Sequence, residues 1–419
     1  MKILLVEPKY YTQYPPLGLL KMSTLHKASG DEVRFVRGLS LVTRFVPDEI
    51  KVTSLFTWAW RPVWEAVAFY RALFPKAKLS LGGIYASLTP DHAKGSGADE
   101  IVKGLLREAE DLLPDYGLVP EWHTKQAASV LFSHRGCIRS CSFCAVPQLE
   151  GKPFQIRPTT HIKHLIHPDH KRVILWDNNI LGESKWREVL AELKELKAEV
   201  DFNQGLDARL VTEEVAHGLK DLRIPTIRLA YDFPSMRESV RKAVAFLREA
   251  GLTNRRVRHI CSYVLYNYKD KPEDLFERVR DLLAWGVAAY PMRYQPLSGE
   301  YAFEKDSYVS PEWTPKELDM VAAARRVIGY GGAFPPYEGL CRKFMGARGF
   351  HDAFQLRPRK DRPEFHVPAR RKSPADGFEL KEFAWDLLKM GQDHQFPTNG
   401  LVKIGAASRA VDAAVDVPA

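Results

Sequence analysis

Three of the five cysteines in this 419-residue sequence fall within eight residues, as Cys137, Cys141 and Cys144 in the spacing CxxxCxxC. The other two, Cys261 and Cys341, lie far away, so the cluster does not come from a cysteine-rich background. Thiolates are the soft ligands that hold iron–sulfur clusters, zinc or copper(I). Three thiolates at this spacing can hold three irons of a cubane cluster and leave the fourth iron open.

The segment around these cysteines resembles the cluster loop of the radical S-adenosylmethionine superfamily, with Gly136 before the first cysteine and Phe143 before the last. The resemblance implies that the three cysteines ligate a 4Fe-4S cluster and that Phe143 lies at the S-adenosylmethionine site. It also implies reductive cleavage to a 5′-deoxyadenosyl radical, with an electron donor such as flavodoxin or ferredoxin. Two alternatives stay open: a zinc site with His134 as the fourth ligand, and cysteines buried in the core.

The length of the chain predicts two or three domains, because one core rarely exceeds about 250–300 residues. The chain is 45% hydrophobic and 27% charged, which indicates a globular protein. No apolar run reaches the ~20 residues of a membrane span. The first seven residues indicate a strand and not a signal peptide, so we expect a cytoplasmic protein without membrane contact. A net charge of +9 suits an anionic substrate, but it is also common in soluble enzymes.

The first domain, residues 1–125, alternates short apolar strands with helices, as a parallel, doubly wound, Rossmann-like α/β domain does. We expect helices at 15–29 and 63–74, and strands at 2–6, 32–36, 52–56 and 78–81. This domain resembles the cobalamin-binding-type domain that precedes many radical enzymes. The resemblance lies in the order of its segments: a first strand, then Pro-Pro-Leu-Gly-Leu, then Gly-Asp-Glu-Val, then Leu-Gly-Gly-Ile.

This first domain departs from that family at one point. It has no Asp-x-His-x-x-Gly stretch, so no histidine is placed to ligate cobalt from below. His26 lies on an expected helix, and His92 follows a proline turn. A cobalamin-binding domain therefore stays open as an alternative, but we favour a degenerate Rossmann-like cover for the second domain.

The second domain, residues 126–300, repeats a strand–helix unit. We expect six strands with five helices between them, which is the partial (β/α)6 TIM-type barrel of the radical superfamily. The expected strands lie at 130–133, 172–176, 199–203, 226–231, 257–265 and 288–294. Chemistry in such sheets takes place at the carboxyl ends of the strands, and each of these strands ends at a polar or ligand-capable residue: Cys137, Asp177, Asn203, Asp232, Asn267 and Gln295.

The resemblance also implies roles for residues at these strand ends. Asp177, with Asn178 beside it, would accept hydrogen bonds from the methionyl ammonium of the cofactor. The ribose and the carboxylate would contact Asn203, Gln204, Asp207, Arg209 and Asp232. The alternatives are a turn or capping role for Asp177 and a local ion pair between Asp207 and Arg209. No catalytic residue is identified, and candidates for the substrate side are Tyr263, Tyr266, Asn267, Arg293, Tyr294 and Gln295.

The remaining residues, 301–419, read as a mostly helical and irregular C-terminal extension, with an amphipathic helix at 316–328. Residues 342–372 are rich in arginine and lysine and contain Phe350, Phe354 and Phe365. Basic residues among aromatics can bind nucleic acid, although such a stretch is more often a solvated surface. We expect Cys261 to be a core residue, since free cysteines are among the most buried residue types.

Three functional hypotheses follow from these observations. The first is a radical S-adenosylmethionine enzyme that modifies an unknown substrate by hydrogen abstraction, with methyl transfer as its more specific form. The second is a member of the same superfamily that modifies nucleic acid, such as tRNA. The third, from another class, is a non-catalytic protein that binds zinc or an iron–sulfur cluster.

Overall fold

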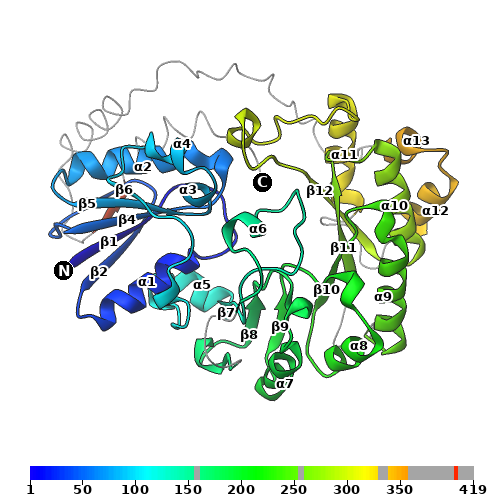
Figure 1. Ribbon diagram of the computed structural model, residues 1–419, viewed down its shortest axis with the longest axis horizontal. Helices are drawn as coiled ribbons and strands as arrows, with labels where there is room; N and C mark the ends of the chain where they lie inside the picture. Colours follow the sequence, from blue (N-terminus) through cyan, green and yellow to red (C-terminus); the bar gives the residue numbers. More distant parts are fainter. Residues whose placement is uncertain (155–160, 253–258, 329–337, 357–400, 404–419) are drawn as a thin grey trace. The chain divides into compact units, whose positions relative to one another are not determined.

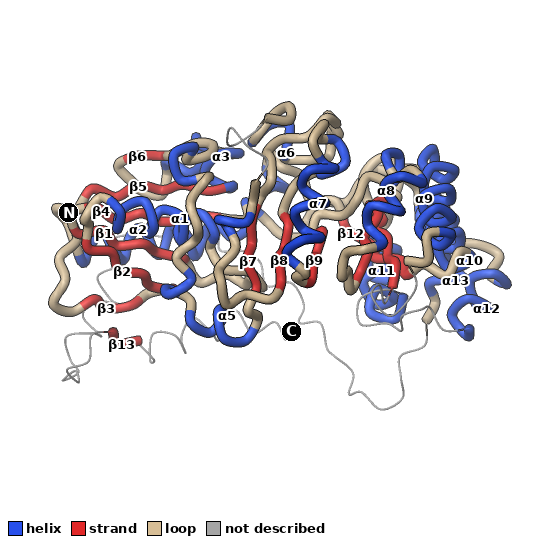
Figure 2. Tube along the Cα trace, turned by 90° about the horizontal axis from the view of Figure 1, so that it is seen from below, coloured by secondary structure: helices blue, strands red, loops and turns tan. Residues whose placement is uncertain are grey.

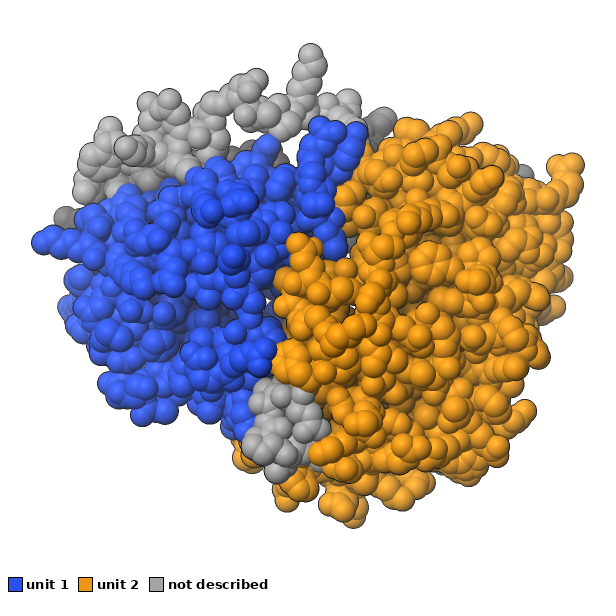
Figure 3. All heavy atoms as spheres, viewed as in Figure 1, with its two compact units in different colours: residues 1–120, 297–304, 365–419 blue, residues 121–296, 305–364 orange. Residues whose placement is uncertain are grey.

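The structure is a computed structural model that describes residues 1–154, 161–252, 259–328, 338–356 and 401–403. These residues form two compact units, which Figure 3 shows in different colours. Unit 1 holds residues 1–120, 297–304 and 401–403, and unit 2 holds the rest of the described chain. Across the described ranges, no helix is long and apolar enough to cross a membrane. The expected domain boundaries at 125 and 300 stay a prediction.

Unit 1 is built on a five-stranded sheet in which every pair of neighbouring strands is parallel (Figure 1). Its strand order is β2 (Glu32–Arg37), β1 (Lys2–Glu7), β4 (Glu49–Ser54), β5 (Lys78–Gly83) and β6 (Glu100–Ile101). The interior strand β1 is fully buried from Ile3 to Val6. A continuous apolar run of this kind is typical of a parallel strand covered on both faces. The doubly wound arrangement predicted from the sequence is confirmed.

Two helices cover opposite faces of this sheet, α1 (Leu17–Ala28) and α2 (Trp60–Leu73). Side chains alternate between the two faces along a strand. On β1, Ile3 and Leu5 pack with Leu19 of α1, whereas Leu4 and Val6 belong to the cluster that contains the apolar face of α2. From β1 the connection through α1 leads to β2 on one side, and from β4 the connection through α2 leads to β5 on the other side. Because both connections are right-handed, their helices lie on opposite faces of the sheet.

Smaller elements complete unit 1. The helices α3 (Ile84–Leu88) and α4 (Pro90–Lys94) follow β5, and the short strand β3 (Ser40–Val42) pairs antiparallel with β13 (Leu401–Lys403). The 3₁₀ turn at Glu300–Phe303 also belongs to this unit. There, the Phe303 carbonyl accepts a hydrogen bond from Trp60 Nε1 at 3.2 Å.

Unit 2 contains the six expected strands, all parallel and in chain order. They form two three-stranded sheets, and Figure 2 shows the three strands of the first sheet side by side. The first sheet contains β7 (Ala128–Leu131), β8 (Arg172–Leu175) and β9 (Glu199–Phe202), and the second contains β10 (Thr226–Ala230), β11 (His259–Tyr266) and β12 (Ala288–Arg293).

The ladder between β9 and β10 is reduced to two isolated bridges, Glu199 with Arg223 and Leu206 with Leu229. The chain turns away between these bridges through Gly205, whose φ is 88°. A left-handed conformation of this kind favours glycine. The six-stranded sheet of the partial barrel therefore has a seam at its centre.

Four long helices connect the strands of unit 2: α7 (Trp186–Leu196), α8 (Glu213–Lys220), α9 (Arg237–Glu249) and α10 (Pro272–Ala284). The Thr212 side chain caps α8 by accepting from Val215 N, and Pro272 occupies the first turn of α10, where no amide proton is needed. Five helices were expected. Between β7 and β8, the described residues hold only the four-residue helix α6 (Val146–Leu149) and a 3₁₀ turn at Lys163–Leu165.

The two faces of these strands differ in chemistry. Val173, Val200 and Ile227 belong to the large hydrophobic cluster that also contains the buried faces of the helices. Their neighbours Arg172, Asp201 and Arg228 lie on the opposite face, because side chains alternate along a strand. Asp201 is almost fully buried and pairs with both arginines, at 2.7 Å to Arg172 Nη2. The ion pair with Arg228 spans the seam between the two sheets.

Three further helices belong to unit 2: α11 (Pro315–Ile328), α12 (Glu338–Gly346) and α13 (Phe350–Phe354). Phe344, Phe350 and Phe354 are fully buried and pack together, so two of the three phenylalanines noted in the basic stretch are core residues. The arginines and lysines of 357–372, together with Phe365, lie outside the described residues, as do 407–419.

Candidate functional site

The cysteine loop, residues 135–154, begins just beyond the carboxyl end of β7. Arg135 and Phe154 close the loop as an antiparallel bridge with N···O distances of 3.1 and 3.0 Å. Gly136 has a φ of 79°, and a Cβ placed there would lie 2.2 Å from the Lys152 carbonyl oxygen. Only glycine fits this turn, so the resemblance to the cluster loop at Gly136 has a physical reason.

Two peptide N–H groups donate to the sulfur atoms of the loop. Arg139 N lies 3.3 Å from Cys137 Sγ, and Val146 N lies 3.5 Å from Cys144 Sγ. All three cysteines are half-buried and free of disulfides. Hydrogen bonds to sulfur and partial burial are two features by which proteins tune iron–sulfur clusters. The donor set therefore suits a cluster that is held by three thiolates.

Charges from other strand ends act on these thiols. Burial raises the pKa of Cys141, the guanidinium of Arg209 opposes this shift, and the carboxyl group of Asp232 adds to it. Burial also raises the pKa of Cys144, and the N–H of Val146 opposes it. Arg209 and Asp232 follow different strands. The predicted convergence of polar strand ends near the cysteines is therefore present at these residues.

Asp177 follows β8 and holds the two residues that precede the cysteine loop, Ser133 and His134. Its Oδ1 accepts from Ser133 N and His134 N, both at 2.9 Å, and from His134 Nδ1 at 2.8 Å. Burial would raise the pKa of Asp177, but its bonds to His134 and Ser133 outweigh burial and keep the pKa below its usual range. Its other oxygen, Oδ2, is buried and accepts from no described group.

His134 is the residue considered as a fourth zinc ligand. Its side chain is almost fully buried, and Nδ1 is already bonded to Asp177. Burial would lower the pKa of His134, but the carboxylate of Asp177 raises it above its ordinary value. Nδ1 is thus engaged, so a metal would have to use Nε2, which is buried and has no described partner. The zinc alternative that includes His134 stays a prediction.

Glu150 joins the loop to the segment after β8. Its Oε2 accepts from Gly136 N and from Asn178 Nδ2, both at 2.8 Å, and its Oε1 accepts from Arg135 Nη1 at 3.0 Å. Asn178 is therefore engaged in holding the loop. The role of Glu150 could not be predicted from the sequence, because no motif marks it and its partners lie up to 28 residues away.

Asp207 is the point where three segments meet. Its carboxylate accepts from Arg139 Nε of the cysteine loop at 2.9 Å, from Asn179 Nδ2 at 3.3 Å and from Arg209 Nε at 2.7 Å. The local ion pair between Asp207 and Arg209, considered as an alternative, is present. Burial would raise the pKa of Asp207, but Arg209 and Arg139 hold it below its usual range. The Oδ1 atom of Asn179 is a second buried acceptor without a described partner.

Aromatic contacts tie the other side of the loop to later segments. The Phe143 ring lies 5.8 Å from that of Phe233 and 5.9 Å from that of Tyr268, between centroids. Ser142 Oγ lies 2.6 Å from the Tyr268 hydroxyl. Phe143 therefore packs between the segments after β10 and β11. Whether it also touches a cofactor stays a prediction.

The ends of β9 and β10 carry the remaining predicted cofactor residues. Gln204 is exposed and donates to Asn203 Oδ1 at 3.3 Å. Burial raises the pKa of Asp232 to about 6, and the charge of Arg278 opposes that shift. Arg278 is 1% exposed and donates from Nη1 to the carbonyl groups of Tyr231, Asp232 and Leu265. Arg278 therefore fixes the ends of β10 and β11. Its role could not be predicted from the sequence, because an arginine in a helix is usually a surface residue.

Three of the six substrate-side candidates hold the structure together. Asn267 is fully buried and bonds to the backbone of Tyr308 and Ser310, both at 2.9 Å. Arg293 donates to the Tyr308 carbonyl at 2.9 Å, and Tyr266 lies in the hydrophobic core. Three candidates remain less enclosed: Tyr263, Tyr294 and Gln295. Cys261 is buried, as predicted, and burial raises its pKa to about 11.

The two histidines considered in unit 1 each form a hydrogen bond through Nδ1. His26 Nδ1 lies 2.7 Å from an Asp31 oxygen, and His92 Nδ1 lies 2.6 Å from the Tyr85 hydroxyl. The ring of His92 is stacked on Phe303 with 3.8 Å between centroids. Their Nδ1 atoms are therefore engaged, and neither histidine stands in an Asp-x-His-x-x-Gly stretch.

Solved structures show what this fold resembles. TsrM from Kitasatospora setae, described as a radical S-adenosylmethionine methyltransferase with cobalamin and a 4Fe-4S cluster bound, matches with a TM-score of 0.54 and 14% identity over 70% of this chain and 74% of that one. TsrM with tryptophan substrate and a cofactor analog bound matches with a TM-score of 0.53 and 15% identity, over 70% and 73%. Neither a protein-family model nor a curated protein sequence matches this chain. The predicted fold is confirmed.

Proposed function

We propose that this protein is a radical S-adenosylmethionine enzyme whose 4Fe-4S cluster is held by Cys137, Cys141 and Cys144. The observation that carries the proposal is the anchoring of the cysteine loop at the carboxyl ends of the parallel strands. Residues after β8, β9, β10 and β11 all contact the loop. When bound, the cluster would supply the electron for reductive cleavage of S-adenosylmethionine, and an unknown substrate would lose a hydrogen atom.

The chain's own residues would bind and orient the cofactor. Asp177 Oδ2 and Asn179 Oδ1 are buried acceptors that lack a described partner. Leaving such an acceptor unsatisfied costs about 1–3 kcal/mol, so both suit a cationic ligand such as the methionyl ammonium. Arg209 is held in place by Asp207 and carries the positive charge that a carboxylate needs. Asp232 would hold ribose hydroxyl groups, and Asn203 with Gln204 would line the same side.

Methyl transfer is the more specific form of this proposal. Its support is the likeness in fold to TsrM, which is described as a methyltransferase with cobalamin bound. Unit 1 offers a doubly wound sheet, but His26 and His92 are engaged elsewhere. The chain lacks the Asp-x-His-x-x-Gly stretch, so cobalamin would have to bind here without the histidine ligand of that motif. A flavodoxin- or ferredoxin-like protein would serve as the electron donor.

The test is anaerobic reconstitution with iron and sulfide, followed by measurement of 5′-deoxyadenosine after addition of a reductant and S-adenosylmethionine. We expect about four irons per chain and cofactor cleavage. Cys144→Ala should lose both, whereas Cys341→Ala, which changes a cysteine outside the loop, should keep both. A reduced, intact cluster that produces no 5′-deoxyadenosine would contradict the proposal. Tight zinc at the three cysteines would favour a non-catalytic binding protein.

Two further measurements address the finer alternatives. A cobalt-type absorption spectrum after incubation with cobalamin would support methyl transfer, and no binding at micromolar concentrations would remove the cobalt route. Affinity for RNA that falls steeply with salt would support nucleic-acid modification. The basic residues on which that alternative rests lie largely outside the described part of the chain.

A further inference from the structure

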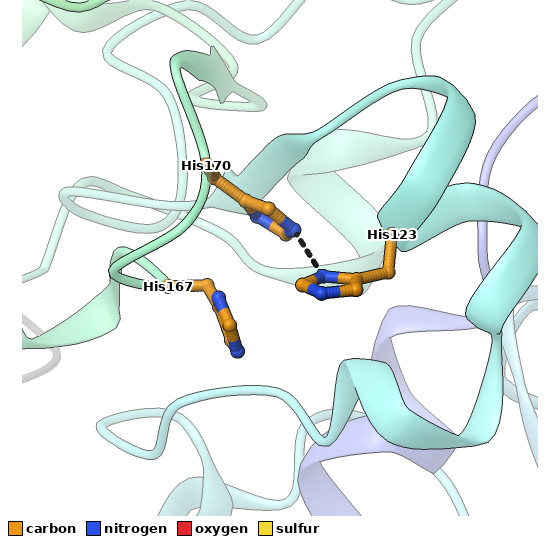
Figure 4. Close-up of side chains that lie close together, drawn as sticks. All are labelled: His123, His167 and His170. Carbon is orange, nitrogen blue, oxygen red and sulfur yellow. Dashed lines mark hydrogen bonds between the residues drawn. The ribbon is translucent and has the colours of Figure 1, made fainter.

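Three histidines of unit 2 gather at the edge of the sheet opposite the cysteine loop. His123 lies on α5 (Pro120–Lys125), and His167 and His170 lie in the segment that leads into β8. Figure 4 shows the three imidazoles between these two elements. One ring nitrogen from each histidine lies within 4.8 Å of the others. The cysteine loop follows the carboxyl end of β7, whereas this histidine cluster lies at the amino ends of β7 and β8.

The spacing of the ring nitrogens is close to that of a metal site. His123 Nδ1 lies 2.9 Å from His170 Nε2. Tetrahedral zinc with Zn–N bonds of about 2.0–2.1 Å places its ligand nitrogens about 3.3–3.4 Å apart. The His123–His170 pair would need to open by only about half an ångström to admit the ion. The exposed Asp169 carboxylate lies 4.0 Å from His123 Nε2 and 3.8 Å from His167 Nδ1. Because His123 faces His170 with Nδ1 and not with Nε2, the Asp169 side chain would have to turn to supply a fourth donor.

A second layer of contacts orients the histidine cluster. Ser129 is a fully buried residue of β7. Its Oγ lies 2.8 Å from His170 Nδ1 and accepts a hydrogen bond from His167 N at 2.9 Å. Histidines that bind a metal through one ring nitrogen usually bond through the other to a neighbouring group, which fixes the ring. The Nδ1 atom of His170 has such a partner, and its Nε2 points toward His123.

The chemistry of the side chains also suits a metal. Imidazole nitrogen is a preferred ligand of zinc, copper and nickel.

We propose that His123, His167 and His170, with Asp169 as the fourth donor, bind one divalent transition-metal ion of the zinc class. The ion fastens α5 and the segment before β8 to the buried Ser129 of β7. In folds of this kind chemistry takes place at the carboxyl ends of the strands, and residues at the amino ends contribute to stability. The site is therefore structural. It is separate from the cysteine loop and does not rest on the function proposed above.

The sequence supplies matched controls for a test. Histidine recurs at every third position as His161, His164, His167 and His170. His161 and His164 are exposed and lie outside the cluster. His164→Ala therefore changes the same histidine-rich segment without removing a proposed ligand, and His123→Ala removes a ligand from another element.

The experiment adds Zn²⁺ to the full chain after its cysteines have been loaded with the iron–sulfur cluster under anaerobic conditions. We expect one zinc per chain after gel filtration, bound equally by His164→Ala and at least about 100-fold more weakly by His123→Ala and His167→Gln. Ser129→Ala should weaken zinc binding about 10–100-fold. Zinc should raise the unfolding temperature of the wild-type chain and of His164→Ala, but not that of His123→Ala.

Co²⁺ then identifies the ligands in the same preparation. A histidine and carboxylate site gives visible cobalt bands without thiolate charge transfer, and circular dichroism of His123→Ala and His167→Gln checks that both variants fold. The proposal is overturned if the cluster-loaded chain takes up no zinc, or if folded His123→Ala and His167→Gln bind it as the wild type does. Cobalt bands with thiolate charge transfer would place the ion on cysteine and overturn it as well.

Discussion

Arg139 Nε donates a hydrogen bond to Asp207 Oδ2 at 2.9 Å and thereby joins the cysteine loop to the segment that follows β9. The same carboxylate holds Arg209. One acidic side chain thus fixes two arginines, one inside the loop and one beside it. The positions of both guanidinium groups therefore depend on the Asp207 carboxylate.

Asp207→Asn should destabilise the cluster-free protein by about 1–2 kcal/mol. The loss is smaller than that of a fully buried ion pair, because Arg139 and Arg209 are each about one-third exposed. The free energy of unfolding in urea measures it. Asp221→Asn is the matched control, since the Asp221 ion pair with Lys194 is largely exposed. Equal effects of the two substitutions would show that Asp207 does not organise the loop.

Gly136→Ala should prevent normal assembly of the cysteine loop. The new Cβ would meet the Lys152 carbonyl oxygen, so we expect a loss of more than about 3 kcal/mol together with loss of iron binding. Gly151 also has a positive φ, 76°, but its Cβ would meet nothing within 4 Å. Gly151→Ala should therefore cost only about 1–2 kcal/mol, from backbone strain alone.

Iron content after anaerobic reconstitution and urea unfolding test the glycine pair together. The comparison separates a steric effect from a general intolerance of alanine at positive φ. If both variants bind iron like the wild type, the turn at Gly136 is not required for the site.

Asp201→Asn should destabilise the protein by about 3–5 kcal/mol, because it removes the carboxylate that Arg228 pairs with and leaves Arg172 with Glu199 alone. Arg228 crosses the seam between the two sheets, so the effect should appear in the unfolding of unit 2. Hydrogen exchange of β9 and β10 amides measures it locally. Glu214→Gln, which removes an exposed pair with Arg187, should change stability by less than about 0.5 kcal/mol. A similarly small effect at Asp201 would contradict the role of the ion pair.

Glu65 on α2 should make stability depend on pH. Burial raises its pKa to about 7, and the charges of Arg61 and Lys9 oppose this. The folded protein thus keeps the proton to higher pH than the unfolded chain does. The contribution of Glu65 is fully present below the unfolded value of about 4.5 and is lost as the pH rises to about 7.

Glu65→Gln should therefore stabilise the protein at pH 8 relative to the wild type, by at most about 3 kcal/mol, and by less because the side chain is partly exposed. The difference should vanish near pH 4. Urea unfolding at both pH values measures this, with Glu108→Gln as the exposed control. A pH-independent difference would show that Glu65 is not the titrating group.

The fold was largely predictable from local patterns. Apolar runs of four to six residues between helical periods placed the six strands of unit 2 to within a few residues. The strand expected at 52–56 was displaced, because β4 begins at Glu49, where polar and apolar residues alternate and the run looks less apolar. The seam between β9 and β10 was not predictable, since it depends on how Gly205 and Asp201 direct two neighbouring strands.

The sequence by itself determined the cysteine spacing, the alternation of strands and helices, and the edge of the sheet at which polar residues collect. Each of these depends on residues that are close together in the chain. Only the tertiary structure decided that Asp177 binds Ser133 and His134, that Glu150 holds Gly136, and that His123 meets His170. These partners lie 14 to 47 residues apart, and which acceptor meets which donor is set by packing between segments that local sequence patterns do not encode.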